Sequence, residues 1–494
     1  MRITKGGWNC CPSTFFSTDR RQGEQELNKK DRQSYEHAIV VGAGIAGLLA
    51  ARALADHYSQ VTVLERDVLP TESKPRAGVP QGYHLHALLP RGLQIMEAFF
   101  PHLNRQMQGA GAIPIDTGAD IAWLTPQGWG VHGNAGLVGI SSTRSLLEYT
   151  IRRRVEGLEN VRICQSIEVA GLLQGSSGEI SGVRMRRRTC GVKFLSEEQS
   201  ADLVVISCGR HNIIQHWFRE VGLVLPKPTV IDAHLGYASR LYRRKKCEAG
   251  WQGLILQAAP PRQVRAGLMF AVEGDRWLVT LTGGDGDFPP TDEEGFLEFA
   301  SSLRSPDLYR AIQDTEPLSS IRGYRGTENR QQHLEKITKW PEGLLVMGDA
   351  ACAFNPIYGQ GMTTAALEAA ALSRLLTEVT DRNKIGRAFQ REVARILRSP
   401  WAMVTGAELR FSSVEGVRAG IMTRMMRAYV DHVLRLGTTD RWARKRFLEV
   451  QGMMREVSAI LLPDMLWRVL STAVASLFPR RKRKTLAPSV SSFE

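Results

Sequence analysis

Apolar residues near the start of the chain recur in a strand, helix, strand order. Residues 38–41 form a short β-branched run, residues 45–55 are rich in alanine and leucine, and residues 61–64 repeat the short apolar run. Short runs of this kind suit buried strands, whereas the longer segment suits a buried helix. The pattern therefore predicts a βαβ unit, which is the building block of a parallel sheet.

Later segments add a hairpin and a helical C-terminal region. Residues 268–273 and 276–282 are apolar and β-branched, and the Gly274-Asp275 dipeptide between them is typical of a tight turn. Residues 363–376 have a helical pattern, and beyond residue 380 arginines and apolar residues recur at helical spacing. We therefore expect a sheet in the middle of the chain and helices at its end.

Three glycines stand in the turn after the first predicted strand and in the first turn of the predicted helix. Gly42 permits a tight turn, Gly44 lets the backbone approach a pyrophosphate, and Gly47 lets the helix pack close to the strand. The phosphates would lie at the helix N-terminus, where free N–H groups and the helix dipole attract anions. Glu65, at the end of the second strand, is placed to accept hydrogen bonds from a ribose diol. The segment predicts a dinucleotide site for either NAD or FAD.

A second motif favours FAD. An apolar strand ends at Asp349, a loop with Pro356 and Gly359 follows, and a helix begins near Gly361 and Met362. Together with the glycine loop, this motif resembles the FAD-dependent monooxygenases of the aromatic-hydroxylase and squalene-epoxidase type, the class A flavin monooxygenases. The resemblance implies that Asp349 holds the flavin ribitol and that the loop lies beside the isoalloxazine ring.

Further residues match that family in chain order. Arg66 follows the ribose-binding glutamate, Arg76 begins a segment that resembles the stretch running past the flavin, and Arg144 matches an arginine that contacts the cofactor. The N–H groups of Gly361 and Met362, at a helix start, would offer donors and a positive dipole to the flavin pyrimidine edge, which is anionic when reduced. The cofactor site is therefore expected to include these five residues.

The resemblance spans roughly residues 38–376 and implies an α/β fold. A Rossmann-like FAD-binding domain is interleaved with a β-sheet substrate domain, and helices follow at the C-terminus. The expected segments are a disordered extension (1–36), the FAD-binding domain (37–115, 139–215 and 340–380), the substrate domain (116–138 and 216–339), a C-terminal helical region (381–478) and a basic tail (479–494).

The charge bears on the kind of partner, and the cysteines bear on metal binding and on the cellular compartment. The net charge of +14 is compatible with nucleic acid, an anionic membrane or a basic solvated face. The arginine runs are not interleaved with aromatic residues in the way that single-strand binding needs, so no nucleic-acid partner is expected. The seven cysteines include no CxxC pair, so no metal site is expected, and a reducing compartment, the cytoplasm, is the simpler prediction.

Residues 463–478 suit a helix, with Pro463 near its start and Asp464 in the first turn. The segment is too short for the hydrocarbon core of a bilayer, and Asp464 and Arg468 interrupt it, so no membrane span is expected. Two alternatives stay open. The helix either lies on a membrane surface together with the basic residues 480–484, or it docks on the protein core.

The resemblance implies FAD as the cofactor, NADPH or NADH as a transient electron donor, and O2 and a small apolar molecule as substrates. It implies oxygen transfer from a flavin C4a-hydroperoxide, which hydroxylates or epoxidises a polyketide, terpenoid or aromatic intermediate. The flavin carries this chemistry, so no catalytic side chain is assigned. His84 and His86 alternate as on one face of an extended segment, and packing is the favoured interpretation over ring contact. Cys352 is expected to be a small buried residue.

One segment departs from the family pattern. Where many members have Asp-Gly and a subgroup has Ser-Gly-Arg, this chain reads Ser207-Cys-Gly-Arg210, and Ile206 stands where the subgroup often has an acid. A separate reductase is therefore a second candidate source of electrons. Three other classes stay open: a flavin halogenase, although its Trp-x-Trp-x-Ile-Pro signature is not in the sequence, a reductase or dehydrogenase of the geranylgeranyl-reductase kind, and a flavoprotein without catalytic activity.

Overall fold

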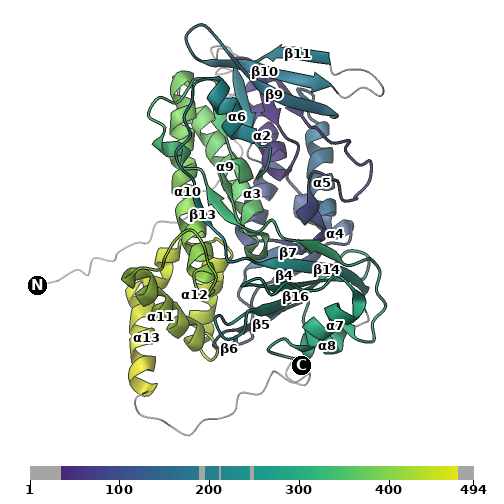
Figure 1. Cartoon of the computed structure of the whole chain (residues 1–494), viewed down its shortest axis with the longest axis vertical. Coiled ribbons are helices and arrows are strands. Elements are labelled where there is room, and N and C mark those ends of the chain that lie inside the picture. Colours follow the sequence, from purple (N-terminus) through teal and green to yellow (C-terminus); the bar gives the residue numbers. More distant parts are fainter. Residues whose placement is uncertain (1–34, 188–194, 211–212, 245–249, 477–494) are drawn as a thin grey trace, which may run out of the picture. The chain divides into compact units, whose positions relative to one another are not determined.

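The computed structural model of the protein describes residues 35–187, 195–210, 213–244 and 250–476. The expected extension up to residue 34 and the basic tail lie outside these residues. From Glu36 onwards the described residues form one compact unit. It is a mixed α/β structure with several sheets, followed by helices near the C-terminus, coloured yellow-green to yellow in Figure 1. The predicted fold class is confirmed.

A five-stranded sheet lies at the centre of the first half of the fold. Its strands, in spatial order, are β20 (Leu344–Val346), β12 (Leu203–Ile206), β1 (Tyr35–Val41), β2 (Tyr58–Leu64) and β8 (Val161–Cys164). β12 is parallel to β1 and β20, and β2 is parallel to β8. Ile39 and Val204 have no exposed surface, as parallel strands covered on both faces require.

Helix α2 (Ile45–Ala55) connects β1 to β2, which confirms the predicted βαβ unit. α2 packs against α9 (Gln360–Glu378) and α5 (Arg144–Glu156), and α9 packs in turn against α3 (Pro90–Phe99). α4 (Leu103–Gly109) and α6 (Ile213–Glu220) complete the helices of this half of the fold. Most residues of α2 are buried, because its small alanine side chains let the neighbouring helices approach closely.

A seven-stranded sheet forms the second half of the fold. Its spatial order is β18 (Arg322–Tyr324), β14 (Gly236–Arg243), β17 (Arg276–Gly283), β16 (Arg265–Val272), β15 (Gly253–Leu256), β5 (Ile121–Thr125) and β6 (Gly128–Trp129). The predicted hairpin is confirmed as β16 and β17, with Gly274 and Asp275 in the turn at φ of 74° and 50°. α7 (Glu293–Ser301) and α8 (Asp307–Ile312) pack on this sheet around the buried Phe296 and Leu308.

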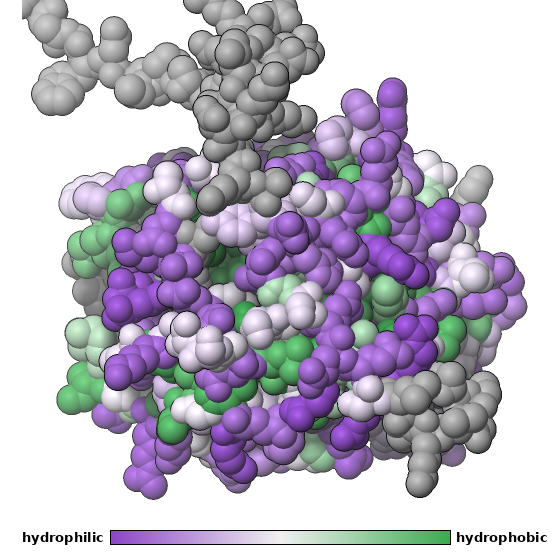
Figure 2. Space-filling model, turned by 90° about the horizontal axis from the view of Figure 1, so that it is seen from above, coloured by the Kyte–Doolittle hydropathy of each residue, from purple (hydrophilic) through white to green (hydrophobic). Residues whose placement is uncertain are grey.

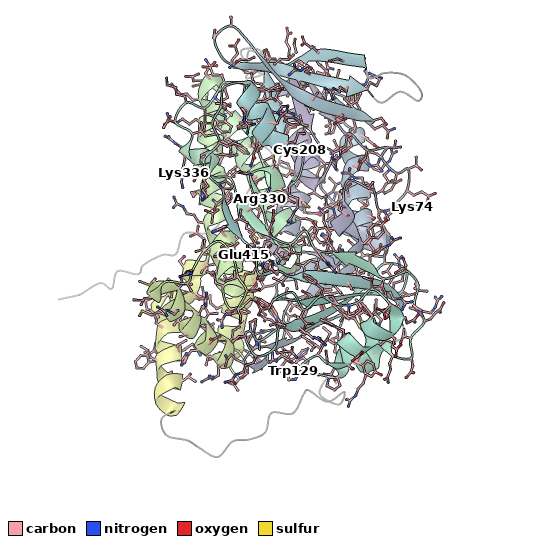
Figure 3. The ribbon with its side chains drawn as sticks, viewed as in Figure 1. Lys74, Trp129, Cys208, Arg330, Lys336 and Glu415 are labelled. Atoms are coloured by element: carbon pink, nitrogen blue, oxygen red, sulfur yellow. The ribbon has the colours of Figure 1, made fainter. Side chains whose placement is uncertain are left out.

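The fold contains three further small sheets. The first consists of β3 (His86–Leu88), β7 (Val138–Ser142) and β4 (Ile113–Asp116), the second of β11 (Leu195–Ser200), β10 (Ile180–Arg187) and β9 (Ile167–Gln174), and the third of β13 (Thr229–Ile231), β19 (Asn329–Gln331) and β21 (Cys352–Ala353). Short 3-10 helices are η1 (Pro80–Tyr83), η2 (Leu334–Lys336), η3 (Gly348–Ala350), η4 (Pro356–Tyr358), η5 (Arg382–Lys384) and η6 (Val457–Leu461). In Figure 3, Cys208 lies in the upper part of the molecule and Trp129 at its lower end.

The predicted C-terminal helices are confirmed as α10 (Ile385–Glu408), α11 (Ile421–Leu436), α12 (Arg441–Gln451) and α13 (Pro463–Ser476). α11, α12 and α13 share an apolar cluster that includes Val433, Phe447 and Met465. α13 is therefore docked through one face, whereas Trp467 and Leu470 on it are exposed. Within the described part of the chain, no helix has the length and apolar character that crossing a membrane requires.

One end of the molecule has a mostly hydrophilic surface. Figure 2 shows the molecule from above the β9–β11 end of Figure 1, and hydrophilic side chains cover most of this face, with apolar side chains in smaller patches. Many arginines there and elsewhere are paired with nearby carboxylates, as Arg184 is with Glu220. Such a face is typical of a solvated surface.

Candidate cofactor and substrate sites

The glycine loop has the geometry that its spacing predicts. Gly42 has a φ of +103°, and a Cβ atom there would lie 2.8 Å from the backbone oxygen of Ser207. A Cβ atom at Gly47 would lie 1.8 Å from the Gly42 oxygen, so α2 approaches the loop too closely for a side chain. A Cβ atom at Gly44, the N-cap of α2, would meet nothing within 4 Å because this position faces open space. The loop thus leaves room for a ligand at the helix N-terminus.

Glu65 is buried at the end of β2, with its carboxylate held from two sides. Oε2 accepts hydrogen bonds from the backbone N–H of Ala43 at 2.8 Å, and Oε1 accepts from that of Asp67 at 3.0 Å. Arg76 reaches the same carboxylate at 3.1 Å and also pairs with Asp67 and Glu148. Burial acts to lower the pKa of Arg76, but the charges of Glu148 and Glu65 raise it above its usual value. Arg76 therefore orients Glu65.

Arg144 is placed by the start of α5. Thr143 caps this helix, since its side chain accepts a hydrogen bond from the N–H of Leu146. Arg144 pairs with Glu148 at 2.9 Å, one turn along the helix. Glu273, in the turn between β16 and β17, accepts from the N–H and hydroxyl of Thr143 at 2.9 and 2.5 Å. The cap thereby ties the helix that carries Arg144 to the large sheet.

Asp349 lies in η3, directly after β20, with its side chain partly exposed to the cavity. Burial raises the pKa of Asp349, whereas the charges of Arg210 and Arg144 lower it. The Arg210 guanidinium is 4.0 Å from the carboxylate. The preceding Gly348 donates its N–H to the buried Glu368 of α9 at 2.6 Å, which fixes the backbone beside Asp349. β20 and α9 therefore position the carboxylate of Asp349 together.

The loop after Asp349 forms η4 and then starts α9. The side chain of Asn355 accepts a hydrogen bond from the N–H of Ile357, and Gly359 has a φ of +67° at the N-cap of α9. Gly361 and Met362 are in the first turn, where backbone N–H groups have no partner within the helix. This helix start offers hydrogen-bond donors and a positive dipole to an anionic group.

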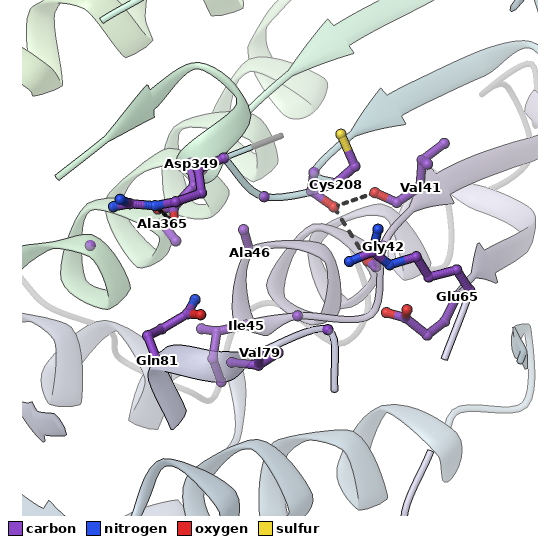
Figure 4. Close-up of a pocket in the computed structure, with 18 of the residues that line it drawn as sticks. Val41, Gly42, Ile45, Ala46, Glu65, Val79, Gln81, Cys208, Asp349 and Ala365 are labelled. Atoms are coloured by element: carbon purple, nitrogen blue, oxygen red, sulfur yellow. Dashed lines mark hydrogen bonds and ion pairs between the residues drawn. The ribbon is translucent and has the colours of Figure 1, made fainter. Parts of the chain in front are cut away.

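These elements surround a cavity of about 460 Å³, here called the cofactor cavity. Of the twelve residues predicted to bind the cofactor, all but Gly47 line it: Gly42, Gly44, Glu65, Arg66, Arg76, Arg144, Asp349, Pro356, Gly359, Gly361 and Met362. Glu65 and Asp349 lie on opposite sides of the first turn of α2 (Figure 4). The cavity offers the groups that FAD needs. These are an acid for a ribose, a helix start for a pyrophosphate and a second helix start for a flavin edge.

The segment that departs from the family pattern also contributes to the cofactor cavity. Ser207 donates its hydroxyl to the backbone oxygen of Val41 at 2.9 Å, which holds β12 beside the glycine loop. Cys208 lines the cavity, and burial raises the pKa of its thiol to about 11. Arg210 donates a hydrogen bond to the backbone oxygen of Phe354 at 2.6 Å. The sequence singled out Arg210 only as part of the departing segment, because its contact with the Asp349 loop arises through tertiary structure.

A second cavity of about 810 Å³, here called the apolar cavity, lies between the large sheet and the C-terminal helices. Its walls include Phe270 of β16, Trp401 of α10 and Phe447 of α12. Pro356 and Gly359 line both cavities, so the loop after Asp349 separates them. Large apolar cavities with few polar groups are typical of sites for small organic molecules.

The two histidines line different cavities. His84 lines the apolar cavity and His86 lines the cofactor cavity. The His84 ring packs against the rings of Tyr237 and Tyr324, and its Nδ1 lies 2.8 Å from the Ser239 hydroxyl. Burial lowers the pKa of His84 to about 4, and burial together with other groups lowers that of His86 to about 3. Both rings are neutral at pH 7.

Two smaller expectations concern metal and thiol chemistry. Cys352 is buried, as predicted, and burial raises the pKa of its thiol well above the usual value. Among the residues that the structure describes, no group of three or more His, Cys, Asp or Glu side chains could hold a metal ion.

Known proteins are similar to this chain in sequence or in fold. Residues 40–100 match the family described as NAD(P)-binding Rossmann-like domain. The protein Rv3254 of Mycobacterium tuberculosis (strain ATCC 25618 / H37Rv) is 30% identical over 425 residues, which cover 83% of this chain and 89% of that protein. The structure of the flavin-dependent brominase Bmp2 aligns with a TM-score of 0.61 at 13% identity, over 89% of this chain and 100% of that chain.

The structure of a monooxygenase aligns with this chain about as well as that of the brominase. The p-nitrophenol 4-monooxygenase PnpA from Pseudomonas putida DLL-E4 aligns with a TM-score of 0.60 at 16% identity, over 85% of this chain and 99% of that chain. At such identities the solved structures show a shared fold. The chain therefore belongs to the family of the mycobacterial protein Rv3254, and its fold is that of the FAD-dependent oxidoreductases of the class A flavin monooxygenase type.

Proposed function

We propose that the protein is an FAD-dependent monooxygenase that hydroxylates or epoxidises an apolar organic substrate. One observation carries the proposal: Pro356 and Gly359 line both the cofactor cavity and the apolar cavity. A substrate in the apolar cavity would therefore lie next to the loop that borders the flavin. Bound FAD, reduced by NADPH or NADH, would supply transfer of one oxygen atom of O2 to the substrate, while the other oxygen leaves as water.

The residues of the cofactor cavity would bind FAD and stabilise the charge of its reduced ring. The glycine loop and Glu65 would hold the adenosine and pyrophosphate, because Gly44 leaves space at a helix N-terminus and Glu65 is an oriented acceptor. Asp349 would hold the ribitol. The N–H groups of Gly361 and Met362 would stabilise the negative charge of the reduced ring, since donors fixed in advance need no reorganisation.

The residues of the apolar cavity orient the substrate and exclude water. Side chains such as Leu256, Phe270 and Trp401 present apolar surface, which favours a polyketide, terpenoid or aromatic molecule over a sugar or peptide. Exclusion of water also suppresses the loss of reducing equivalents to hydrogen peroxide. His84 adds a neutral ring whose Nε2 is buried without a partner, available to a polar group of the substrate.

The experiment that tests the proposal follows flavin absorbance. The purified protein with bound FAD is reduced under anaerobic conditions with NADPH, NADH or dithionite, and is then mixed with oxygenated buffer in a stopped-flow instrument. We expect a nicotinamide to reduce the flavin, and reoxidation to pass through a transient absorbance that belongs to neither oxidised nor reduced flavin. Addition of a substrate should speed the decay of the transient and yield a product with one added oxygen from O2.

Other outcomes would assign other activities. Reduction by dithionite alone, followed by the same transient, would indicate that a separate reductase delivers the electrons. Product formation that requires chloride or bromide would identify a halogenase. Slow reoxidation without a transient, with every reductant and in the presence of apolar substrates, would contradict oxygenation in favour of a reductase or dehydrogenase.

A further inference from the structure

Arg427, on α11, has a charge without a partner on the wall of the apolar cavity. Its Nε and Nη2 atoms are buried, and neither has a hydrogen-bond partner. No ion pair within 4.0 Å joins its guanidinium to a carboxylate of the described residues. Buried donors of a charged group are costly to leave unpaired, so their presence at a cavity points to a ligand that pairs with them.

The charged residues around Arg427 leave its two donors unpaired. Arg410 also lines the cavity, but Asp431 pairs with it at 3.0 Å, and its Nη2 donates to the backbone oxygen of Arg427. Arg424, one turn earlier on α11, is exposed and does not line the cavity. The described lining contains no aspartate or glutamate. Burial and the charges of Arg410 and Arg424 lower the pKa of Arg427, whereas the charge of Asp431 raises it. Arg427 therefore remains the arginine of this wall that has no ion-pair partner among the described residues.

The two unpaired N–H groups of Arg427 also have a defined geometry. Nε–H and Nη2–H point in parallel from one edge of a guanidinium, and this edge matches the two oxygens of a carboxylate. We propose that Arg427 binds the carboxylate of an otherwise apolar substrate in this cavity. A single arginine without an ion-pair partner matches a carboxylate better than a phosphate monoester, which carries close to two charges at pH 7.

This inference rests on the proposed function in one respect, namely that the apolar cavity is the substrate site. An acid held at α11 would leave its apolar body to fill the cavity towards the loop of Pro356 and Gly359, where the cofactor cavity begins. Arg427 would then be a binding residue that fixes the direction in which the substrate enters. The regiochemistry of oxidation would depend on the distance between the acid and the oxidised carbon.

The test is a binding experiment with the oxidised, full-length protein and no reductant. The neutral dye N-phenylnaphthylamine, which fluoresces in apolar surroundings, is bound first, and it is then displaced at pH 8 by dodecanoic acid, dodecanol or dodecyl phosphate. We expect the acid to displace the dye at about tenfold lower concentration than the alcohol, as a charge-assisted bidentate pair implies. Dodecyl phosphate should bind no more tightly than the acid.

Matched variants assign the effect to Arg427. Arg427→Met should make the acid and the alcohol equal while leaving dodecanol binding unchanged, and Arg427→Lys should fall between. Arg424→Met, which removes an exposed arginine from the same helix, should keep the wild-type preference. Retained FAD absorbance and melting temperature would show that each variant is folded.

Either of two results would overturn the inference. One is equal binding of acid and alcohol by the wild-type protein, a comparison that needs no variant. The other is a preference for the acid that survives in Arg427→Met. Tighter binding of the phosphate would overturn the assignment of a carboxylate. Because no electrons or oxygen are used, failure here is distinct from failure of the proposed monooxygenase reaction, which the stopped-flow experiment measures.

Discussion

The side-chain amide of Asn355 donates a 2.7 Å hydrogen bond to the buried carboxylate of Glu408. The amide of Asn329 donates to the other carboxylate oxygen at 2.5 Å. Both amides are fixed, because Oδ1 of Asn329 accepts from the N–H of Asn355 and Oδ1 of Asn355 accepts from the N–H of Ile357. Glu408 is the last residue of α10, so this C-terminal helix holds the loop that separates the two cavities.

Glu408→Gln should destabilise the protein and loosen that loop. Glutamine presents one N–H2 group to two fixed amide donors, which leaves a buried donor unpaired at a cost of about 1–3 kcal/mol. Urea unfolding at pH 8 measures the change, and titration of the apoprotein with FAD should show weaker binding. Glu392→Gln, on the same helix with the surface partners Arg374 and Arg395, is the control and should cost less than about 1 kcal/mol. Equal costs would contradict the role of Glu408.

The same carboxyl group should make stability depend on pH. Burial raises the pKa of Glu408 to about 7, above the value of 4.5 for an unperturbed glutamate. The folded state therefore binds a proton more tightly than the unfolded state. The stabilisation that this group contributes is complete below about pH 4.5, is lost as the pH rises to about 7, and stays constant above it.

The slope from one such group is at most about 1.4 kcal/mol per pH unit. Glu368, whose pKa burial raises to about 8, acts in the same direction, so the comparison of wild type with Glu408→Gln is the informative measurement. Chemical unfolding between pH 5 and pH 8 should show a shallower decline for the variant. Identical slopes would show that Glu408 is ionised throughout this range.

Gly44→Val should remove FAD without unfolding the protein. A side chain at Gly44 meets no protein atom within 4 Å, so it would occupy the space that we assign to the pyrophosphate. Gly420→Val is a close control, because Gly420 is also an N-cap in extended conformation with nothing within 4 Å, and it does not line the cofactor cavity. Flavin absorbance per protein should fall in the first variant alone. Full occupancy in Gly44→Val would refute the site, and Asp349→Ala offers an independent check.

The sequence predicted those parts of the site whose geometry is local. Gly42 and Gly47 could be placed because backbone turns and close helix packing impose glycine within a few residues of one another. The Gly274-Asp275 turn was predictable for the same reason. In each case the physical requirement and the residues that meet it lie in one segment.

The remaining site residues depend on contacts between distant segments. Glu408 meets Asn329 and Asn355 across 79 and 53 residues of sequence. Arg427 belongs to a region that the sequence identified only as helical, and nothing in helical spacing says that its guanidinium faces a cavity. The spacing of His84 and His86 likewise could not show that the two rings line different cavities.

Glu65→Ala should weaken FAD binding without abolishing it. The variant loses the acceptor for a ribose diol and also frees Arg76 and the N–H of Ala43, so we expect a loss of about 1–3 kcal/mol in binding free energy. Equilibrium titration of the apoprotein with FAD gives the value, with the exposed Glu72→Ala as control. Unchanged affinity would mean that another acid serves the ribose.

The membrane contact that the sequence left open as one of two alternatives stays untested, and the structure identifies the residues with which to test it. Trp467 and Leu470 on α13 are exposed by 72% and 59%, and Ile421 and Met425 on α11 by 71% and 63%. Because apolar side chains on an interfacial helix bind by entering the headgroup region, Trp467→Ser with Leu470→Ser should reduce sedimentation with phosphatidylcholine–phosphatidylglycerol vesicles several-fold. Val224→Ser, at a residue exposed by 84% and distant in sequence, should change nothing. Equal sedimentation of all three proteins would leave α13 as a helix that only docks on the core.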